Sequence, residues 1–176
     1  MQERSFEQAE HLHRRGARRL LAIRWMIRRN IRKLSGGDTR PLLATIAPDA
    51  TLTFPGDNSW SGQFRHPVAD REPHPTHIGR SEIERFLDRV VEHGVQMEVE
   101  DILVNGPPWN TRVAAIVHDW VPGDGGDRYA NRAVLTARAV WGRIHAMEDF
   151  EDTERVAAYD RLIGLEPVPR PDAARA

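Results

Sequence analysis

Apolar residues recur at three- and four-residue spacing near the start of the chain, where no proline interrupts residues 5–34. Leu20, Ile27, Ile31 and Leu34 belong to this pattern, which places side chains on one face of a helix. The opposite face is rich in arginine. The spacing therefore predicts a long amphipathic helix over residues 5–34, with one buried stripe.

A second, shorter helix is predicted after the glycines that end the first. Asp38 is its expected N-cap, and Leu42, Leu43 and Ile46 form its apolar side. Residues 50–54 then have the composition of a short strand. Two helices therefore precede the first predicted strand.

A long loop rich in proline and histidine spans residues 57–79. Loops of this length in compact domains are more often functional than idle. We expect a lid in which Trp60 closes on an apolar substrate, with a surface excursion or a subunit contact as the alternatives. The spacing of His66, His74 and His77 does not match a recognised metal site, so no metal is predicted.

A third helix and four strands complete the predicted order of elements. Ser81 and Glu84 fit a capping box at the start of that helix, and Gly94 ends it. The strand-like runs are residues 95–104, 111–121, 129–141 and 143–150. Their short, glycine-bearing connections favour a curved antiparallel meander. A short helix over residues 153–163 and a loose tail over residues 167–176 follow.

Composition limits the classes of protein that fit. A chain of 176 residues with 40% hydrophobic content buries one core, so we expect a single domain over residues 1–166. Cysteine is absent, which excludes disulfides and thiolate chemistry. No apolar run approaches the roughly 18 residues of a membrane span, and the N-terminus lacks a signal-peptide core. We therefore expect a cytoplasmic protein without a membrane partner.

Charge is unevenly distributed along the chain. Residues 1–40 carry eleven basic and four acidic side chains, against fourteen and twenty-two in residues 41–176. The basic helix face is either solvated beside an acidic body or meets an anionic partner. Lys33 is the only lysine, and arginine richness alone does not predict nucleic-acid binding, so nucleic acid is not an expected partner.

Two carboxylates lie near the ends of long apolar strands, which is the most informative feature of the sequence. Asp119 ends the second predicted strand of the meander, and Asp149 ends the fourth. Carboxylates are rarely buried unless they are paired or have a chemical role. Either the two aspartates form an acid/base pair in a pocket, or they face solvent or pair with Arg132 or Arg143.

The strand register decides which side chains face such a pocket. His118 and Asp119 are neighbours on one strand, so their side chains point to opposite faces. If Asp119 faces inward, Asp149 accompanies it, whereas an inward His118 brings Glu148 by the same parity. Asn131 on the adjacent strand is expected to hydrogen-bond a substrate oxygen or to lie at a sheet edge. The sequence leaves these alternatives open.

Aromatic residues near the strand ends are candidates for the pocket wall. Trp109, Trp120 and Trp141 either line it or pack in the core or between subunits. Of the aromatic residues near the strand ends, Trp120 and Phe54 are predicted to contact the substrate.

The order helix, helix, strand, long loop, helix and four antiparallel strands resembles the nuclear-transport-factor-2-like superfamily over roughly residues 15–160. The resemblance is carried by Gly37-Asp38, Ala47-Pro48-Asp49-Ala50, Gly79-Arg80, Gly142-Arg143-Ile144, Glu148 and Asp152. It implies an α+β fold in which a cone-shaped, curved antiparallel sheet wraps around N-terminal helices and a pocket. It also implies a homodimer formed through the open face of the sheet.

Within this superfamily the chain looks most like the SnoaL-like polyketide cyclases and the limonene-epoxide-hydrolase group. Asp119 and Asp149 fall on the paired aspartates of the epoxide hydrolases, and Tyr129 and Gly142 coincide with a tyrosine and a glycine of that group. SnoaL-like enzymes use a histidine and an aspartate, which makes His118 the competing catalytic candidate.

The chain departs from the epoxide-hydrolase pattern at three positions. Val117 stands where that group has a bridging arginine, and Leu52 and Phe54 replace a tyrosine and an asparagine that hold the water. A full epoxide-hydrolase site is therefore absent.

The resemblance implies a cofactor-independent acid/base enzyme of the cyclase, isomerase or epoxide-hydrolase type. Its expected substrate is a hydrophobic, oxygenated small molecule such as a polyketide or terpenoid intermediate. Two carboxylates in one dry cavity push their pKa values apart, so one can act as an acid and the other as a base. The alternative is a non-catalytic ligand-binding or assembly module, because a fold does not fix a function.

Overall fold

The computed structural model describes residues 2–54 and 77–165, with side chains from residue 16 onward. The elements are α1 (Gln2–Ser35), α2 (Arg40–Leu43), β1 (Ile46–Thr53), β2 (His77–Ile78), α3 (Arg80–Glu92), β3 (Gln96–Asn105), the short 3-10 helix η1 (Pro108–Asn110), β4 (Thr111–Val121), β5 (Tyr129–Val140), β6 (Arg143–Phe150) and α4 (Thr153–Leu162). Trp60, most of the predicted lid and the predicted tail lie outside the described residues.

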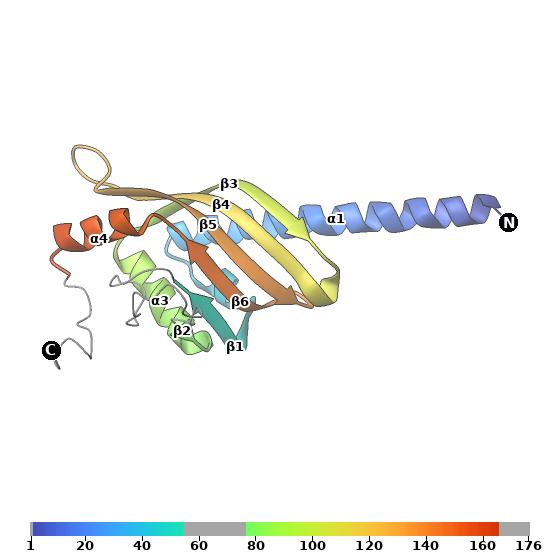
Figure 1. Cartoon of the computed structure of the whole chain (residues 1–176), viewed down its shortest axis with the longest axis horizontal. Coiled ribbons are helices and arrows are strands. Elements are labelled where there is room, and N and C mark those ends of the chain that lie inside the picture. The colour runs from blue at the N-terminus through green and yellow to red at the C-terminus, as the bar shows by residue number, and fades with distance from the viewer. Residues whose placement is uncertain (1, 55–76, 166–176) are drawn as a thin grey trace, which may run out of the picture.

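The strands form one curved sheet in the order β2-β1-β6-β5-β4-β3 (Figure 1). Strands β3 to β6 are antiparallel neighbours, which confirms the predicted meander. Strand β1 pairs with β6 in parallel, and β2 pairs with β1 in antiparallel orientation, so the sheet is mixed. The architecture is the expected α+β cone, in which helices cover the concave side of a bent sheet.

Helix α1 lies along the sheet with its C-terminal half and extends well beyond the sheet with its N-terminal half (Figure 1). Two of its arginines bind the sheet rather than solvent. Arg28 donates through Nη1 to the carbonyl oxygen of Val99, and Arg19 donates through Nη1 to Thr111 Oγ1 at 3.1 Å. Part of the basic face predicted for this helix is therefore used to dock α1 on β3 and β4.

The hydrophobic core has two clusters. One joins α3 and β1 and includes Ile46, Leu52 and Ile83, while the other joins α1 to β3 and β4 and includes Ile31 and Val117. A cavity lies between the helices and the concave face of the sheet. No described helix has the length and apolar composition needed to cross a membrane.

The second helix is shorter than predicted. It ends at Leu43, and Ile46 is the first residue of β1, so the helix expected through Ile46 is wrong. Ile144 donates its backbone N–H to the carbonyl oxygen of Thr45 at 2.8 Å, and Ile46 pairs with Ile144 on β6. Pairing with a distant strand therefore overrides the helical spacing of the local sequence. Asp38 is not an N-cap but forms an ion pair with Arg40 at 2.7 Å.

The start of α3 also differs from the prediction. Its N-cap is Gly79, whose φ of 87° is a conformation that residues with a side chain rarely adopt. The capping box predicted at Ser81 and Glu84 is therefore wrong. Glu82 supplies the nearest equivalent, because its Oε2 accepts the backbone N–H of Ile78 at 2.8 Å.

Candidate functional site

A cavity of about 430 Å³ lies between the concave face of the sheet and helices α1 and α3. Its wall is almost entirely apolar. The larger lining side chains are Met26, Ile27, Phe54, Phe86, Leu135 and Met147. Such a space favours a hydrophobic small molecule over a charged or strongly hydrated one.

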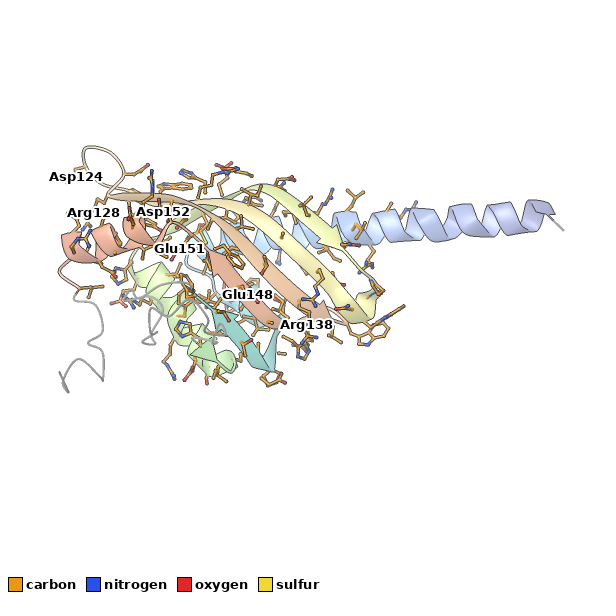
Figure 2. The ribbon with its side chains drawn as sticks, viewed as in Figure 1. Asp124, Arg128, Arg138, Glu148, Glu151 and Asp152 are labelled. Atoms are coloured by element: carbon orange, nitrogen blue, oxygen red, sulfur yellow. The ribbon has the colours of Figure 1, made fainter. Side chains whose placement is uncertain are left out.

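Among the polar side chains that line this cavity are Asp119 of β4, Tyr129 of β5, Asp149 of β6 and Glu151, which follows β6. Alternation explains why Asp149 and Glu151 face the same way, because residues two apart on an extended chain point to the same face. Figure 2 shows Glu151 near the end of β6, where the sheet meets α4, and Glu148 farther back on the strand. The carboxyl groups thus gather at one end of the cavity.

Asp119 is the most buried of the cavity carboxyl groups, with 8% of its surface exposed. Burial raises its pKa above the usual value, while a hydrogen bond from the Tyr129 hydroxyl and one from its own backbone N–H lower it. Its Oδ1 has no hydrogen-bond partner among the described residues. The hydrogen bond from the Tyr129 hydroxyl stabilises the ionised form of Asp119.

Asp149 and Glu151 titrate far from their usual range. Burial, with a further contribution from the negative charge of Asp119, raises the pKa of Asp149 to about 7. Burial and then the charges of Asp149 and Asp119 raise the pKa of Glu151 to about 9. At neutral pH, Glu151 is therefore protonated and Asp149 is poised between its two forms.

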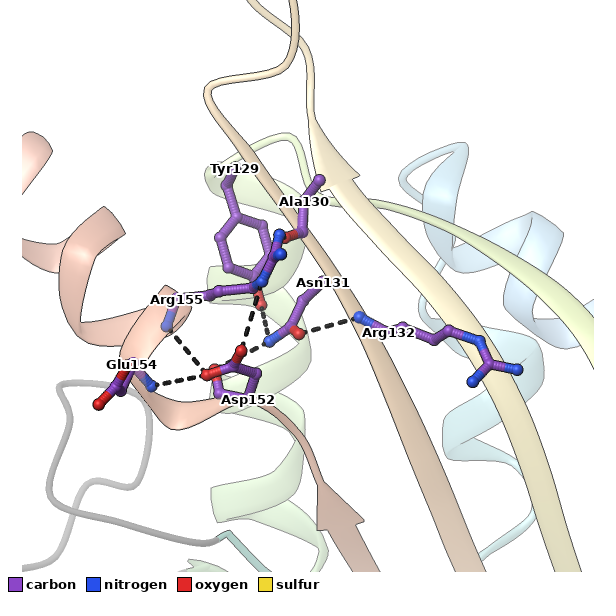
Figure 3. Close-up of polar contacts among 7 residues, drawn as sticks. All are labelled: Tyr129, Ala130, Asn131, Arg132, Asp152, Glu154 and Arg155. Atoms are coloured by element: carbon purple, nitrogen blue, oxygen red, sulfur yellow. Dashed lines mark hydrogen bonds and ion pairs between the residues drawn. The ribbon is translucent and has the colours of Figure 1, made fainter.

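Asn131 supports this site from the strand beside Asp119 (Figure 3). Its Nδ2 donates to the Tyr129 hydroxyl and to the carbonyl oxygen of Asp152, each at 3.1 Å, and its Oδ1 accepts the Arg132 N–H at 2.9 Å. With 4% of its surface exposed, it holds Tyr129 and the end of β6 together. Asn131 does not line the cavity, so the substrate contact expected for it is not supported by its position.

His118, Trp120 and Glu148 point away from the cavity interior. The rings of His118 and Trp120 stack on the outer face of β4 with centroids 5.2 Å apart, and neither residue lines the cavity. Glu148 forms part of the cavity wall, but it is exposed and lies on the face opposite to Asp149. In this register the inward pair is Asp119 and Asp149, because alternation turns His118 outward. Trp120 is turned outward in the same way, so its position does not support the substrate contact predicted for it.

Two arginines that were alternative partners for the aspartates bind elsewhere. Arg132 forms an ion pair with Glu100 at 2.9 Å, and Arg143 donates through Nη1 to the carbonyl oxygen of Ala44 at 2.9 Å. Neither neutralises Asp119 or Asp149. The salt-bridge interpretation of these aspartates is therefore not supported within the part of the chain that the structure describes.

The positions that depart from the epoxide-hydrolase pattern are buried. Val117 is 1% exposed, and Leu52 and Phe54 are 6% and 5% exposed. All three line the cavity, and the ring of Phe54 packs against Phe86 with centroids 5.3 Å apart. Phe54 therefore lines the cavity, and its contact with a substrate stays a prediction. Val117 leaves an apolar surface beside Asp119 in place of a bridging guanidinium.

The remaining tryptophans of the meander lie at the opposite end of the sheet. Trp109 and Trp141 pack on each other with ring centroids 5.9 Å apart, and they are 59% and 70% exposed. They are therefore not buried in the core of the described chain.

Glu151 was not assigned a role from the sequence. It shares the parity of Asp149, so alternation alone predicts that both face inward. The predicted strand ends at residue 150, one residue before Glu151. The structure shows an extended backbone at the N-cap of α4, Asp152, which continues the strand direction beyond β6.

The chain matches no protein-family model, and no curated protein is significantly similar to it in sequence. Its similarities are to solved structures. A protein with an NTF2-like fold and unknown function from Burkholderia pseudomallei has a TM-score of 0.54 and 22% identity, covering 79% of this chain and 95% of that one. A loop-truncation variant of IdmH has a TM-score of 0.56 and 21% identity, covering 76% and 95%.

A third similar structure is the CaMKII hub of S. rosetta, with a TM-score of 0.52 and 14% identity over 74% of this chain and 95% of the hub. At these identities the similarity concerns the fold alone. The protein has the nuclear-transport-factor-2-like fold, as its sequence predicted. Structures of this fold include a hub and proteins of unknown function, so the fold leaves the activity open.

Proposed function

We propose that the cavity is the active site of a cofactor-independent acid/base enzyme acting on a hydrophobic, oxygenated small molecule. The observation that carries this proposal is the pairing of Asp119 and Asp149 inside an apolar cavity. The Tyr129 hydroxyl favours the ionised form of Asp119, while the pKa of Asp149 is raised to about 7. One carboxyl group is thus suited to accept a proton and the other to donate one at neutral pH.

Asp119 is the proposed base and Asp149 the proposed acid. In an isomerase or cyclase reaction, Asp119 removes a proton from the carbon next to a carbonyl, and Asp149 donates its proton to the developing enolate oxygen. In epoxide hydrolysis, Asp119 takes a proton from water as the water oxygen attacks carbon. Asp149 then protonates the epoxide oxygen as its carbon–oxygen bond breaks.

The test is turnover of apolar ketones and epoxides by the intact protein. Hydrogen exchange beside the carbonyl in deuterated water reports the first reaction, and diol formation reports the second. Asp119→Asn and Asp149→Asn are each expected to lower the rate by about 100-fold or more. Glu98→Gln is the matched control, since Glu98 is an exposed carboxylate on β3, opposite the outward His118, and does not line the cavity. Turnover that survives both aspartate substitutions contradicts the proposal.

The second candidate is a non-catalytic ligand-binding or assembly module. The apolar side chains of Val117, Leu52 and Phe54 favour it, because these three positions offer no polar group to position water. For this candidate we expect apolar ligands to bind without turnover. Both the parent protein and Asp119→Asn should then leave the ligand chemically unchanged.

A homodimer is proposed for either candidate. Val134 and Phe150 lie opposite each other on β5 and β6 and are 37% and 52% exposed. Apolar side chains on an outer sheet face are suited to a subunit contact.

A further inference from the structure

The acidic end of the cavity presents hydrogen-bond acceptors without matching donors. Asp119 Oδ1, Asp149 Oδ1 and Glu151 Oε1 are shielded from solvent and have no hydrogen-bond partner among the described residues. Asp119 as a whole is only 8% exposed, yet its side chain borders the cavity. Buried acceptors that face a cavity are sites at which a ligand can supply the missing donors.

The nearby basic side chains do not supply these donors. Arg155 forms an ion pair with Asp152 at 3.4 Å and donates to the carbonyl oxygen of Ala130 at 3.0 Å, on the outer side of β5 (Figure 3). Arg132 is bound to Glu100. The Tyr129 hydroxyl is a donor at this cluster, and it already bonds Asp119.

The number of carboxyl groups exceeds what the proposed acid/base reaction requires. Asp119 and Asp149 are sufficient for that chemistry, and Glu151 adds a third acidic group, with which no basic side chain among residues 16–54 and 77–165 forms an ion pair. An alcohol or ketone brings no charge and at most one donor to such a cluster. A protonated amine brings a positive charge and several N–H donors, and charge-assisted hydrogen bonds are stronger than neutral ones.

We propose that the acidic end of the cavity, formed by Asp119, Asp149 and Glu151, binds the protonated nitrogen of an apolar amine. The hydrocarbon part of the ligand then fills the remaining apolar cavity, beside side chains such as Leu135 and Met147. This site does not depend on the proposed function, because it requires only binding and no chemical step.

Binding of a cation at this site is linked to the release of protons. Burial and the neighbouring aspartates raise the pKa of Glu151, and the charges of Asp160 and Asp152 add to this effect. Burial raises the pKa of Asp119, while hydrogen bonds from the Tyr129 hydroxyl and from its own backbone N–H, and the charge of His118 on the outer face, lower it. The pKa of Asp149 is about 7 and that of Glu151 about 9, so the free protein holds protons there near neutral pH. A neighbouring cation lowers these pKa values and expels protons.

The test compares 1-adamantanamine with 1-adamantanol, which share a hydrocarbon cage and differ in the polar group. Calorimetric titrations near neutral pH, in two buffers of different ionisation enthalpy, give the affinity and the number of protons released. We expect the amine to bind at least about tenfold more tightly than the alcohol, and with proton release that the alcohol does not cause.

Two variants identify the groups responsible. Glu151→Gln and Asp149→Asn are each expected to reduce the preference for the amine by about tenfold. Glu98→Gln is expected to preserve it, because Glu98 is exposed on β3 and does not line the cavity. Thermal unfolding checks that each variant is folded. Equal affinity for amine and alcohol, no binding of the amine at millimolar concentration, or amine binding without proton release overturns the proposal. None of these results bears on turnover of ketones and epoxides, so the proposed reaction is tested separately.

Discussion

Asp119 and Asp149 face one cavity from strands that are not neighbours, since β5 lies between β4 and β6. Asp119 pairs with Asn131 of β5, and Asp149 pairs with Leu135 of the same strand. The curved sheet nevertheless brings their charges close enough that Asp119 contributes to the raised pKa of Asp149. The middle strand therefore sets the geometry of the carboxyl pair.

Ionisation of the buried carboxyl groups is expected to make stability fall as the pH rises. The pKa of Asp149 rises from 3.8 to about 7 and that of Glu151 from 4.5 to about 9 on folding. The folded state thus binds more protons than the unfolded state between those values, and stability is lost as the pH passes through the folded pKa values. Each pKa unit corresponds to about 1.4 kcal/mol, so the ionisation of either group lowers the free energy of unfolding by several kcal/mol.

Urea unfolding between pH 5 and pH 9, at roughly unit steps, measures this dependence. The variants Asp149→Asn and Glu151→Gln should each flatten the slope, while Glu148→Gln should leave it as it is. A stability that rises across this range is incompatible with the burial of the two groups.

Tyr129→Phe is expected to raise the pKa of Asp119 further. The variant removes the hydroxyl that donates a hydrogen bond to Asp119 and leaves the aromatic ring in place. The ionised form of Asp119 therefore loses a stabilising hydrogen bond. The measurement is a carbon-13 NMR titration of the Asp119 carboxyl group. Tyr159→Phe is the control, because Tyr159 packs against the Tyr129 ring with centroids 5.2 Å apart but does not contribute to the pKa shift of Asp119. An unchanged titration in Tyr129→Phe would refute this role of the hydroxyl.

Asn131→Ala is expected to destabilise the protein by about 2 to 3 kcal/mol. The buried amide makes hydrogen bonds to Tyr129, Asp152 and Arg132, and its removal leaves buried partners unsatisfied. Urea unfolding measures the change. Asn110→Ala, at an exposed position of η1, should stay within about 0.5 kcal/mol of the parent. Similar effects of the two substitutions would argue against a supporting role for Asn131.

Gly79→Ala is expected to cost about 1 to 2 kcal/mol. The φ of 87° at Gly79 strains any residue with a side chain, although a Cβ there would meet only the carbonyl oxygen of Pro48 at 3.5 Å. The cost is therefore a backbone effect. Gly16→Ala is the control, since Gly16 lies in α1 with nothing within 4 Å of a Cβ, and no destabilisation is expected there. Chemical denaturation of both variants distinguishes the two cases.

Phe150→Asp is expected to prevent dimer formation without closing the cavity. Phe150 is exposed on the outer face of β6, and a charge at an apolar subunit contact is unfavourable. Light scattering over a concentration series gives the oligomeric state, and binding of an apolar ligand checks the cavity. Glu148→Gln serves as the control on the same strand. A parent protein that stays monomeric throughout the series excludes the proposed dimer.

Apolar spacing predicts the first helix, and apolar runs between turn residues predict the long strands. Residues 111–121 are predicted as a strand and form β4, because an apolar run, VAAIV, lies there between connections rich in glycine and proline. The local sequence does not decide between Asp119 and His118, since a shift of one residue exchanges the two faces. Only packing against α1 and α3 resolves that choice, and packing is a property of the whole fold.

Local sequence misled the prediction where distant segments meet. Ile46 fits a helical spacing with Leu42 and Leu43, but its partner is Ile144, which lies almost a hundred residues further on. Glu151 was missed for a related reason, because it becomes part of the cavity only where β6 runs on toward α4. The candidate site thus depends on contacts between segments far apart in the chain, and local sequence patterns do not reveal such contacts.

The parallel pairing of β1 with β6 has a consequence for the time course of folding. Contacts between segments far apart in the chain form slowly, because a long loop must close before they are gained. During synthesis, β1 leaves the ribosome long before β6, which carries Asp149. The hairpins from β3 to β5 can form first, while the edge of β1 stays unpaired until the last strand arrives. The acidic end of the cavity is therefore the part of the molecule that is assembled last.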